Sequence, residues 1–347
     1  MENIDFFSLG ETVESYVVDN LRDMGKESSV RPVVSVLMAV FNENPAYLEH
    51  AIDSILNQTF EKMEFVVLDD GSNDKNTIDT LNWLLLKSPK VRLFREPHRG
   101  LTKTLNLGLS YSRGDYICRL DSDDWCEPSR IEKQVDYLIK NTEIGMVGSF
   151  VMLHQEDGTP LWVSTYPLTP SEIAKSFDER NPFCHGSVCF RKDVITKVGG
   201  YREELNCSQD YDFFWRICNQ FSVANLPEVL YHYRFRRESI SSQKAFEQAK
   251  VTKIARILAE MRQRGSNENY VEALRIAENS VLGSDMKFKS VLKQADNLML
   301  AGDYNRSFQV YVKGIFTRPF SSTHWLKLIR WTLFVIFPVF RKRLFNI

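Results

Sequence analysis

Three carboxylates within four residues form the pattern with the most chemical content in this sequence. Asp121, Asp123 and Asp124 follow a strand-like run that ends at Leu120. Carboxylates held this close repel one another and raise one another's pKa unless a cation neutralises them. Alternation along an extended backbone places Asp121 and Asp123 on one face, where hard oxygen ligands suit Mg²⁺ or Mn²⁺ carrying substrate phosphates. An isolated Asp-x-Asp is more often a solvated turn, so its surroundings must decide.

The elements expected around this cluster alternate between strands and helices. Residues 33–40 form a near-continuous apolar run, typical of a strand buried on both faces of a parallel sheet. Asn44 and Pro45 fit the N-cap and first residue of a helix. The same alternation predicts strands over 65–69, 91–94 and 116–120, helices over 74–87 and 101–109, and a helix from Pro128 with Ile131, Val135, Leu138 and Ile139 facing inward.

Strands alternating with helices predict a doubly wound α/β sheet, whose ligands lie at the carboxyl ends of the strands. Asp69 and Asp70 end one predicted strand, and Asp121 and Asp123 follow another. Because both pairs fall at that edge, a functional interpretation outweighs that of a solvated turn. No G-x-G-x-x-G or Walker-type loop follows a predicted strand, which disfavours a Rossmann dehydrogenase or a P-loop enzyme. We therefore expect a metal, rather than a glycine loop, to hold phosphate.

Length and composition set the limits of the interpretation. The 347 residues suffice for one large α/β domain plus an appendage, and 44 Lys and Arg against 45 Asp and Glu give no support to a nucleic-acid binder. The charge is uneven, because residues 304–347 carry +8 and residues 1–303 carry −9. Six cysteines without C-x-x-C spacing and a start without the features of a secretory signal predict a reducing, cytoplasmic setting.

Several ordered motifs resemble those of glycosyltransferase family 2, the inverting sugar-nucleotide transferases with a GT-A fold. The matching segments are residues 35–42, 67–72, 114–117, 121–124, 185–187, 191, 198–201, 209–212 and 233–241. Several motifs in order are far more specific than one. The resemblance implies a GT-A domain, Rossmann-like with a mostly parallel sheet, over residues 31–243. We expect an N-terminal extension (1–30), a helical appendage (244–320) and a basic, aromatic membrane-associating tail (321–347) around it.

The same resemblance implies a nucleotide-sugar site. Base and ribose are expected at the loop after the first strand, which holds Ala39, Val40, Phe41 and Glu43, and at Asp69 or Asp70. Asp123 is expected on the cation, Asp121 near the ribose or donor sugar and as a second metal ligand, and Asp124 close to the donor sugar. Lys103 and Asn106 are candidates for the nucleotide, and His185 for the acceptor or diphosphate. Each has a structural alternative: residues 69–72 suit a turn and helix N-cap, Lys103 and Asn106 solvated helix positions, and His185 a structural histidine.

Inversion requires a base that takes the proton of the attacking acceptor hydroxyl. Asp210 is the candidate, in the first turn of a helix that the spacing of Tyr211, Phe214 and Trp215 predicts. An acid in a first turn also complements the helix dipole. The family's usual pair is Glu-Asp, whereas this chain has Gln209 before Asp210. The Gln-x-x-Arg-Trp element of processive synthases is absent, so we expect one sugar per encounter.

The C-terminal tail combines aromatic, apolar and basic residues. Its uninterrupted apolar part, residues 331–340, has ten residues against roughly 20 needed to span a bilayer, and Pro338 breaks it. Tryptophans flanked by Lys and Arg fit an interfacial helix on an anionic leaflet. The alternative is a terminal helix docked on the protein's own core.

Together these features predict a cytoplasmic enzyme, peripheral on the inner face of the cell membrane. It would be a Mn²⁺- or Mg²⁺-dependent inverting glycosyltransferase that moves one sugar, from a UDP-hexose by preference, to a lipid-diphosphate-linked glycan in O-antigen, capsule or lipopolysaccharide biosynthesis. One alternative is a sugar-1-phosphate nucleotidyltransferase, but residues 41–45 are no glycine- and Arg/Lys-rich triphosphate loop. The other is a non-catalytic glycan-binding or scaffold protein with a degenerate site, for which Gln209 is the only hint.

Overall fold

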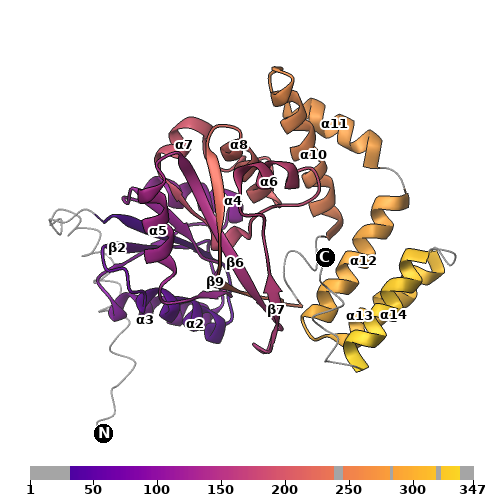
Figure 1. The fold of residues 1–347 in the computed structure, drawn as a ribbon. Helices are drawn as coiled ribbons and strands as arrows, with labels where there is room; N and C mark the ends of the chain where they lie inside the picture. The colour runs from indigo at the N-terminus through magenta and orange to yellow at the C-terminus, as the bar shows by residue number, and fades with distance from the viewer. Residues whose placement is uncertain (1–31, 238–244, 282–283, 318–321, 337–347) are drawn as a thin grey trace, which may run out of the picture.

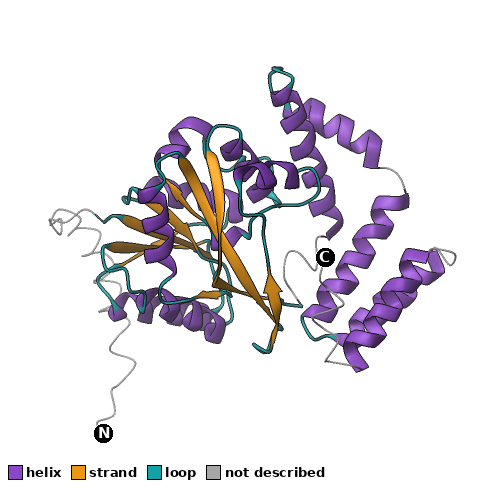
Figure 2. Ribbon diagram, viewed as in Figure 1, coloured by secondary structure: helices purple, strands orange, loops and turns teal. Residues whose placement is uncertain are grey.

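The computed structural model describes residues 32–237, 245–281, 284–317 and 322–336. The predicted extension over 1–30, the 239–241 part of the last motif and the basic residues after 336 lie outside the described residues. Figure 1 shows a twisted sheet with helices on both faces and a group of C-terminal helices beside it, and Figure 2 shows that this group contains no strand among the residues described. The predicted α/β class with a C-terminal helical extension is confirmed.

One mixed sheet of nine strands forms the centre of the molecule. Its strands lie in the order β3 (Val91–Arg95), β2 (Met63–Asp69), β1 (Val34–Val40), β4 (Tyr116–Arg119), β8 (Cys189–Arg191), β6 (Ile144–His154), β9 (Ser222–Arg234) and β5 (Trp125–Cys126), and β7 (Pro160–Ser164) pairs with β6. The pairs from β3 to β4 are parallel, as predicted, and so is β6 with β9. β8 runs antiparallel to both β4 and β6. The sheet therefore has two parallel groups joined by the reversed strand β8, while β5 and β7 also run antiparallel to their partners β9 and β6.

Alternating residues of β1 belong to two cores, one on each face of the sheet. Val34, Val36 and Met38 pack in one cluster, with the inner faces of α2 (Pro45–Leu56), α3 (Lys75–Lys87) and α5 (Arg130–Lys140). Leu37 and Ala39 pack in the other, with α4 (Leu101–Tyr111) and α8 (Gln209–Cys218). This alternation follows from the two-residue period of a strand, and explains why a strand covered on both faces reads as an unbroken apolar run.

Local signals explain most helix boundaries. The Asn44 side chain accepts a hydrogen bond from the Ala46 N–H, so the predicted cap of α2 is confirmed. Helix α5 begins at Arg130 rather than at Pro128, and Ile131, Val135 and Leu138 are buried. Ile139 was predicted to face inward, which is wrong: its side chain is 53% exposed. It follows Leu138 by one residue, which places it at the edge of a stripe with a 3.6-residue period.

The chain between β7 and α8 contains α6 (Pro170–Ser176), the short helix η3 (His185–Ser187), β8 and α7 (Asp193–Val198). The C-terminal region then forms α10 (Ala245–Gln263), α11 (Tyr270–Val281), α12 (Ser284–Leu300), α13 (Tyr304–Thr317) and α14 (Ser322–Ile336). Ala255 and Ala259 of α10 join the apolar cluster that contains α8. The helical region therefore packs directly on the element that presents Asp210.

Helix α14 has two different faces. Phe334 is fully buried against Trp162 and Met299, so this face docks on the protein as the alternative interpretation of the tail proposes. Leu326 and Ile329 are 66% and 55% exposed on the same helix. No helix within the described ranges has both the length and the apolar character needed to cross a membrane.

Candidate active site

The strand register brings the predicted carboxylates to one edge of the sheet. Val40 lies opposite Asp69 at the end of β1 and β2, and Leu37 lies opposite Arg119 at the end of β4. The chain that leaves β4 therefore enters Asp121–Asp124 beside the ends of β1 and β2. In the sheet β1 lies between β2 and β4. Both acidic pairs thus lie at the carboxyl end of the parallel strands, after β2 and β4 on either side of β1.

Asp70 organises the loop before α4. Its carboxylate accepts hydrogen bonds from the backbone N–H groups of Arg99 (2.8 Å) and Gly100 (3.0 Å) and from the Thr104 hydroxyl (2.7 Å). Only 3% of the residue is exposed. The carboxylate is thus occupied by the start of α4 and by His98, whose Nδ1 lies 2.9 Å from Oδ2. These contacts give Asp70 the structural role that the alternative interpretation describes.

Asp69 closes the turn that follows β2. Its Oδ1 accepts a hydrogen bond from the Ser72 N–H (2.9 Å), and its Oδ2 lies 3.6 Å from Arg95 Nε. Gly71 lies between Asp69 and Ser72 and has φ +76°. A Cβ at this position would lie 2.6 Å from the backbone nitrogen of His98, so only glycine fits the turn. Asp69 therefore also has a structural role, as the turn interpretation predicts.

An exposed aromatic shelf lies beside this turn. The Phe41 ring stacks on the His98 ring with centroids 4.2 Å apart and 26° between the planes. Phe41 is 45% exposed, although it directly follows the buried strand β1. A large exposed ring at a strand end offers a face on which a nucleobase can stack. Ala39, two residues before Phe41, is buried within the sheet and supports this loop from the interior.

The three aspartates of the acidic cluster have different partners. Asp121 forms an ion pair with Arg119, whose guanidinium is buried. Asp124 is 1% exposed and accepts hydrogen bonds from the Tyr231 hydroxyl (2.8 Å) and the Arg234 N–H (2.7 Å). Burial, followed by the charges of Asp123 and Asp121, raises the pKa of Asp124 well above its usual value. Asp124 therefore joins the loop to β9 and is enclosed by protein.

Asp123 faces Glu43 and one arginine. Arg236 Nη1 lies 3.2 Å from Asp123 Oδ2 and donates to both Glu43 oxygens, at 2.8 and 2.9 Å. Ser122 Oγ also donates to Glu43 Oε2 at 3.0 Å. Burial first, then the charges of Glu43 and Asp121, raise the pKa of Asp123 to about 6, against which Arg236 acts in the opposite direction. Glu43 is therefore part of the acidic cluster.

The described residues contain no group of three or more His, Cys, Asp or Glu side chains placed to hold a metal ion by themselves. Mg²⁺ and Mn²⁺ are commonly held by one or two carboxylates together with substrate phosphates rather than by an all-protein cage. Asp123, with Glu43 and Asp121 near it, supplies hard oxygen donors whose repulsion a cation relieves. The donor set thus fits such a metal.

Asp210 lies in the first turn of α8, as predicted. Its Oδ2 accepts a hydrogen bond from Asn181 Nδ2 at 2.7 Å. His185 in η3 lies 3.0 Å from the Tyr201 hydroxyl through Nε2. Burial, followed by the charge of Arg119, lowers the pKa of His185, while Asp210 and Asp121 both oppose that shift. Both carboxylates therefore act on His185 electrostatically, and a Cβ on the neighbouring Gly186 would lie 2.9 Å from Asp121 Oδ2, which places η3 beside the acidic cluster.

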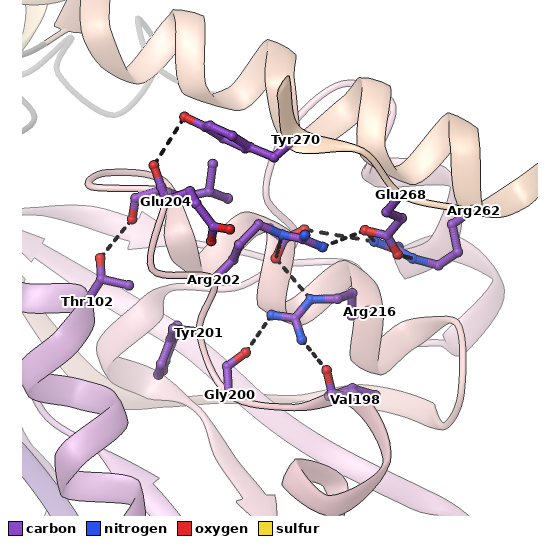
Figure 3. A network of polar contacts seen from close by, with 12 residues as sticks. Thr102, Val198, Gly200, Tyr201, Arg202, Glu204, Arg216, Arg262, Glu268 and Tyr270 are labelled. Carbon is purple, nitrogen blue, oxygen red and sulfur yellow. Dashed lines mark hydrogen bonds and ion pairs between the residues drawn. The ribbon is translucent and has the colours of Figure 1, made fainter. Parts of the chain in front are cut away.

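A buried charge network holds α8 in place (Figure 3). Asp212, two residues after Asp210, is 1% exposed and lies 2.9 Å from Arg216 Nε, 3.5 Å from Arg202 Nε and 3.8 Å from Arg262 Nη2. Arg216 also donates to the carbonyls of Val198 and Gly200. Glu268, between α10 and α11, binds Arg262 and Arg202. The network thus ties α8 to α7, to the loop after it and to the helical region.

Two other predicted residues lie near this network. Asn106 donates to the Tyr201 carbonyl and accepts from the Tyr201 N–H, both at 2.8 Å, so its amide fixes the backbone beside His185. Lys103 lines an open hollow of about 650 Å³ with Asn106, Tyr201, Arg202, Glu203 and Glu204. Within the described residues neither side chain forms a hydrogen bond or ion pair with the acidic cluster, which puts both at the margin of the site.

Sequence reasoning missed the positively charged side chains of the site. Arg119 and Arg236 neutralise the acidic cluster, and Asn181 holds Asp210. Lys293 of α12 lies within electrostatic range of Asp210. Its Nζ donates to Gln248 Oε1 at 3.3 Å. The arginines at 234, 236 and 237 lie at the end of a strand that reaches the site. This arginine-rich segment was therefore a sequence signal for Arg236. Lys293 has no comparable local signal.

Comparison with known proteins identifies the family. Residues 35–199 match the sequence profile of the family described as glycosyl transferase family 2. The chain is 33% identical over 220 residues to the amylovoran biosynthesis glycosyltransferase AmsE of Erwinia amylovora, covering 62% of this chain and 81% of that one. It is also 33% identical over 210 residues to the O-antigen biosynthesis glycosyltransferase WbnJ of Escherichia coli, covering 60% and 81%. The chain belongs to glycosyl transferase family 2. The prediction of a glycosyltransferase is therefore confirmed.

The fold of this family 2 member also has a solved counterpart. S. aureus TarS 1–349 superposes with a TM-score of 0.50 at 16% identity, over 85% of this chain and 77% of that one. The same protein in complex with UDP-GlcNAc gives a TM-score of 0.50 at 14% identity, over 77% and 81%. Identities this low show the fold alone. The predicted GT-A architecture is confirmed.

Proposed function

We propose that this family 2 glycosyltransferase moves one hexose, with inversion, from a nucleotide-sugar, UDP-hexose by preference, to a hydroxyl of a lipid-diphosphate-linked glycan. The observation that carries the proposal is the placement of His185. Asp121 of the acidic cluster and Asp210 at the start of α8 both act electrostatically on His185, and a Cβ on the next residue, Gly186, would lie 2.9 Å from Asp121 Oδ2. The leaving diphosphate needs its negative charge neutralised, whereas the attacking hydroxyl needs a base on the opposite side of the same sugar carbon. The acidic cluster and Asp210 provide these two positions.

The donor half of the proposal is built on the edge of β1, β2 and β4. Phe41 offers its exposed face to the base. Asp69, whose Oδ2 has only a 3.6 Å contact with Arg95, is better placed than Asp70 to accept a hydrogen bond from a base or ribose. Asp123 and Asp121 would hold Mn²⁺ or Mg²⁺, and this ion would neutralise the charge that develops on the diphosphate. Asp124 acts indirectly, since its hydrogen bonds fix the loop that carries Asp123.

The acceptor half depends on Asp210. Asn181 holds Oδ2, and Oδ1 has no partner among the described residues, so Oδ1 is the atom that would accept the hydroxyl proton. The charge network around Asp212 holds the helix that carries it. Gln209 is 4% exposed, so the position that is usually Glu in the family is enclosed by protein here. A neutral amide at that position avoids a second buried carboxylate beside the base.

Membrane association is the second part of the proposal. Trp325, Leu326, Ile329 and Ile336 form an exposed apolar stripe on α14, whose other face docks through Phe334. No acidic residue follows Asp303 in the sequence, so the stripe belongs to a segment whose charge suits an anionic leaflet. The relatives named for O-antigen and amylovoran biosynthesis favour a glycan acceptor in surface-polysaccharide assembly, which a lipid carrier would present at this leaflet.

The donor site is tested by isothermal titration of the full chain with UDP, GDP and dTDP, each with and without Mn²⁺. We expect one nucleotide, UDP by preference, to bind in a Mn²⁺-dependent manner, and Asp123→Asn to abolish that dependence. Asp210→Asn should bind the same nucleotide with unchanged affinity but lose turnover of the donor sugar. Retained turnover in Asp210→Asn would remove Asp210 as the base. Folded protein that binds none of the three nucleotides would overturn the donor site.

The membrane part is tested by sedimentation with vesicles that contain phosphatidylglycerol. We expect the full chain to sediment, and Leu326→Glu with Ile329→Glu to reduce binding at least tenfold. Val271→Glu on α11 is the matched control, because Val271 is 74% exposed and apolar but lies outside the stripe. Equal loss in both variants would assign the effect to added negative charge and overturn the stripe.

A further inference from the structure

We propose that Arg236 is a built-in counter-cation of the metal carboxylates, which occupies the position between Glu43 and Asp123 until a divalent metal displaces it. The proposal rests on the metal site of the proposed function and adds a residue that competes for it. It predicts that the positive charge of Arg236 lowers the affinity of the free protein for the metal.

The geometry at Nη1 carries the argument. This single nitrogen lies within 2.8, 2.9 and 3.2 Å of three carboxylate oxygens that belong to two residues far apart in the chain. An arginine bound to one carboxylate usually uses two nitrogens for its two oxygens. Here one nitrogen serves both carboxylates, so it sits where the oxygens converge. That is also the position that a small cation would take between them.

Burial makes a positive charge necessary there. Glu43 is 6% exposed, and an unpaired carboxylate so enclosed would carry a large desolvation cost. The Asp123 carboxylate faces the same arginine nitrogen, so without Arg236 two negative charges would oppose each other there. In the absence of metal, Arg236 offsets these costs and keeps the two carboxylates together. The site is thus assembled in advance, although the metal must compete for it.

Arg236 is placed so that it can leave. It follows the last residue of β9, Arg234, by two positions, and its contacts with Glu43 and Asp123 are made between side chains. Arg234, by contrast, donates its backbone N–H to Asp124 and its Nε to the Asp123 carbonyl. A side chain beyond a firmly bonded strand end can rotate without disturbing the strand. A metal ion and the guanidinium nitrogen repel each other and cannot both occupy the point where these oxygens converge, so metal binding at that point requires Nη1 to move away.

Arg237 provides a matched control. It carries the same charge one residue later, but it pairs with Glu156 at 2.6 Å and is 54% exposed. Replacing Arg237 removes one positive charge from the same segment without touching Glu43 or Asp123. A difference between Arg236 and Arg237 variants therefore separates direct competition from the general field of the protein.

The experiment is Mn²⁺ titration of the full chain without nucleotide, followed by the electron paramagnetic resonance signal of free Mn²⁺. We expect Arg236→Gln to bind Mn²⁺ about tenfold more tightly than the unchanged chain, equivalent to about 1.4 kcal/mol. Arg237→Gln should match the unchanged chain within about twofold, as expected for a screened exposed charge. Arg236→Lys, which keeps the charge, should stay close to the unchanged chain and serves if Arg236→Gln does not fold.

The outcomes separate the two proposals. Equal or weaker Mn²⁺ binding in Arg236→Gln would overturn the counter-cation role while leaving the metal site intact, and so would equal tightening in both Gln variants. If Asp123→Asn binds Mn²⁺ as the unchanged chain does, or if no variant binds it even with UDP, the metal site of the proposed function fails and Arg236 has nothing to compete with.

Discussion

Replacing Asp212 by Asn should destabilise the protein strongly even though Asp212 touches no substrate in the proposed mechanism. The substitution keeps the size of the side chain and removes the negative charge that three arginines share. Arg216, Arg202 and Arg262 lie 2.9, 3.5 and 3.8 Å from this carboxylate. All three guanidinium groups are at least four-fifths buried, so water cannot replace the lost charge fully.

The magnitude follows from the partners that remain. Removing one member of a buried ion pair costs about 3–5 kcal/mol, because the other charge stays buried and uncompensated. Glu268 still neutralises Arg262 and Arg202, and Arg216 still donates to two backbone carbonyls. The Asn carbonyl can also accept one hydrogen bond. We therefore expect the lower end of the range, a loss of about 3 kcal/mol in the free energy of unfolding.

Urea unfolding followed by tryptophan fluorescence measures this loss, with Asp210→Asn as the control. Both substitutions remove a negative charge from the first turn of the same helix, so the helix-dipole contribution cancels in the comparison. Among the described residues the Asp210 carboxylate accepts a hydrogen bond from Asn181 alone, so its variant should lose less than about 1 kcal/mol. The reasoning is refuted if Asp212→Asn and Asp210→Asn unfold within about 1 kcal/mol of each other.

Three further substitutions test other contacts. Partial burial alone would raise the pKa of Glu268, but Arg262 and Arg202 outweigh it and lower that pKa. Glu268→Gln should therefore be less stable than the unchanged chain at neutral pH. Urea midpoints should show that this difference disappears as the pH falls from about 4.5 through the lowered pKa of Glu268. Gly186→Ala would overlap the Tyr231 hydroxyl and should lower unfolding free energy by about 1–3 kcal/mol, whereas unchanged stability would argue against close packing there. Phe41→Ala should weaken nucleotide binding in the titration about tenfold without changing the melting temperature, as expected if a base stacks on it; equal affinity would exclude the shelf.

The parallel half of the fold could be predicted because each of its strands is covered on both faces. An unbroken apolar run is then the only pattern that both cores accept, and β1, β2 and β4 lie within a residue or two of the predicted runs. The reversed strand β8 has three residues, too few for any period to show. Its pairing depends on β4 and β6, which lie far away in the sequence, so its direction could not be predicted locally.

The acidic side of the site could be predicted for the same reason, since strand ends can be located in a sequence. Its cations could not, because Arg236 reaches Glu43 across almost two hundred residues of chain and no local pattern records that contact. Lys293 reaches the neighbourhood of Asp210 only through the packing of α12 and α10. Which positive charge serves which carboxylate is a property of the folded chain.

The hydrogen-bond donors of each carboxylate separate structural from exchangeable acids, which look alike in a motif. Asp70 and Asp124 are held by backbone N–H groups, at Gly100 and Arg234 among others, and those donors cannot leave unless the local backbone changes. Asp123 and Asp210 are held in these contacts by side chains alone, Arg236 and Asn181. A side-chain donor can rotate aside when a ligand arrives, at the cost of about one charge-assisted or neutral hydrogen bond. Asp123 and Asp210, together with Asp121 and its Arg119 partner, are therefore acids that the proposed metal and acceptor hydroxyl can engage without a change in the local backbone.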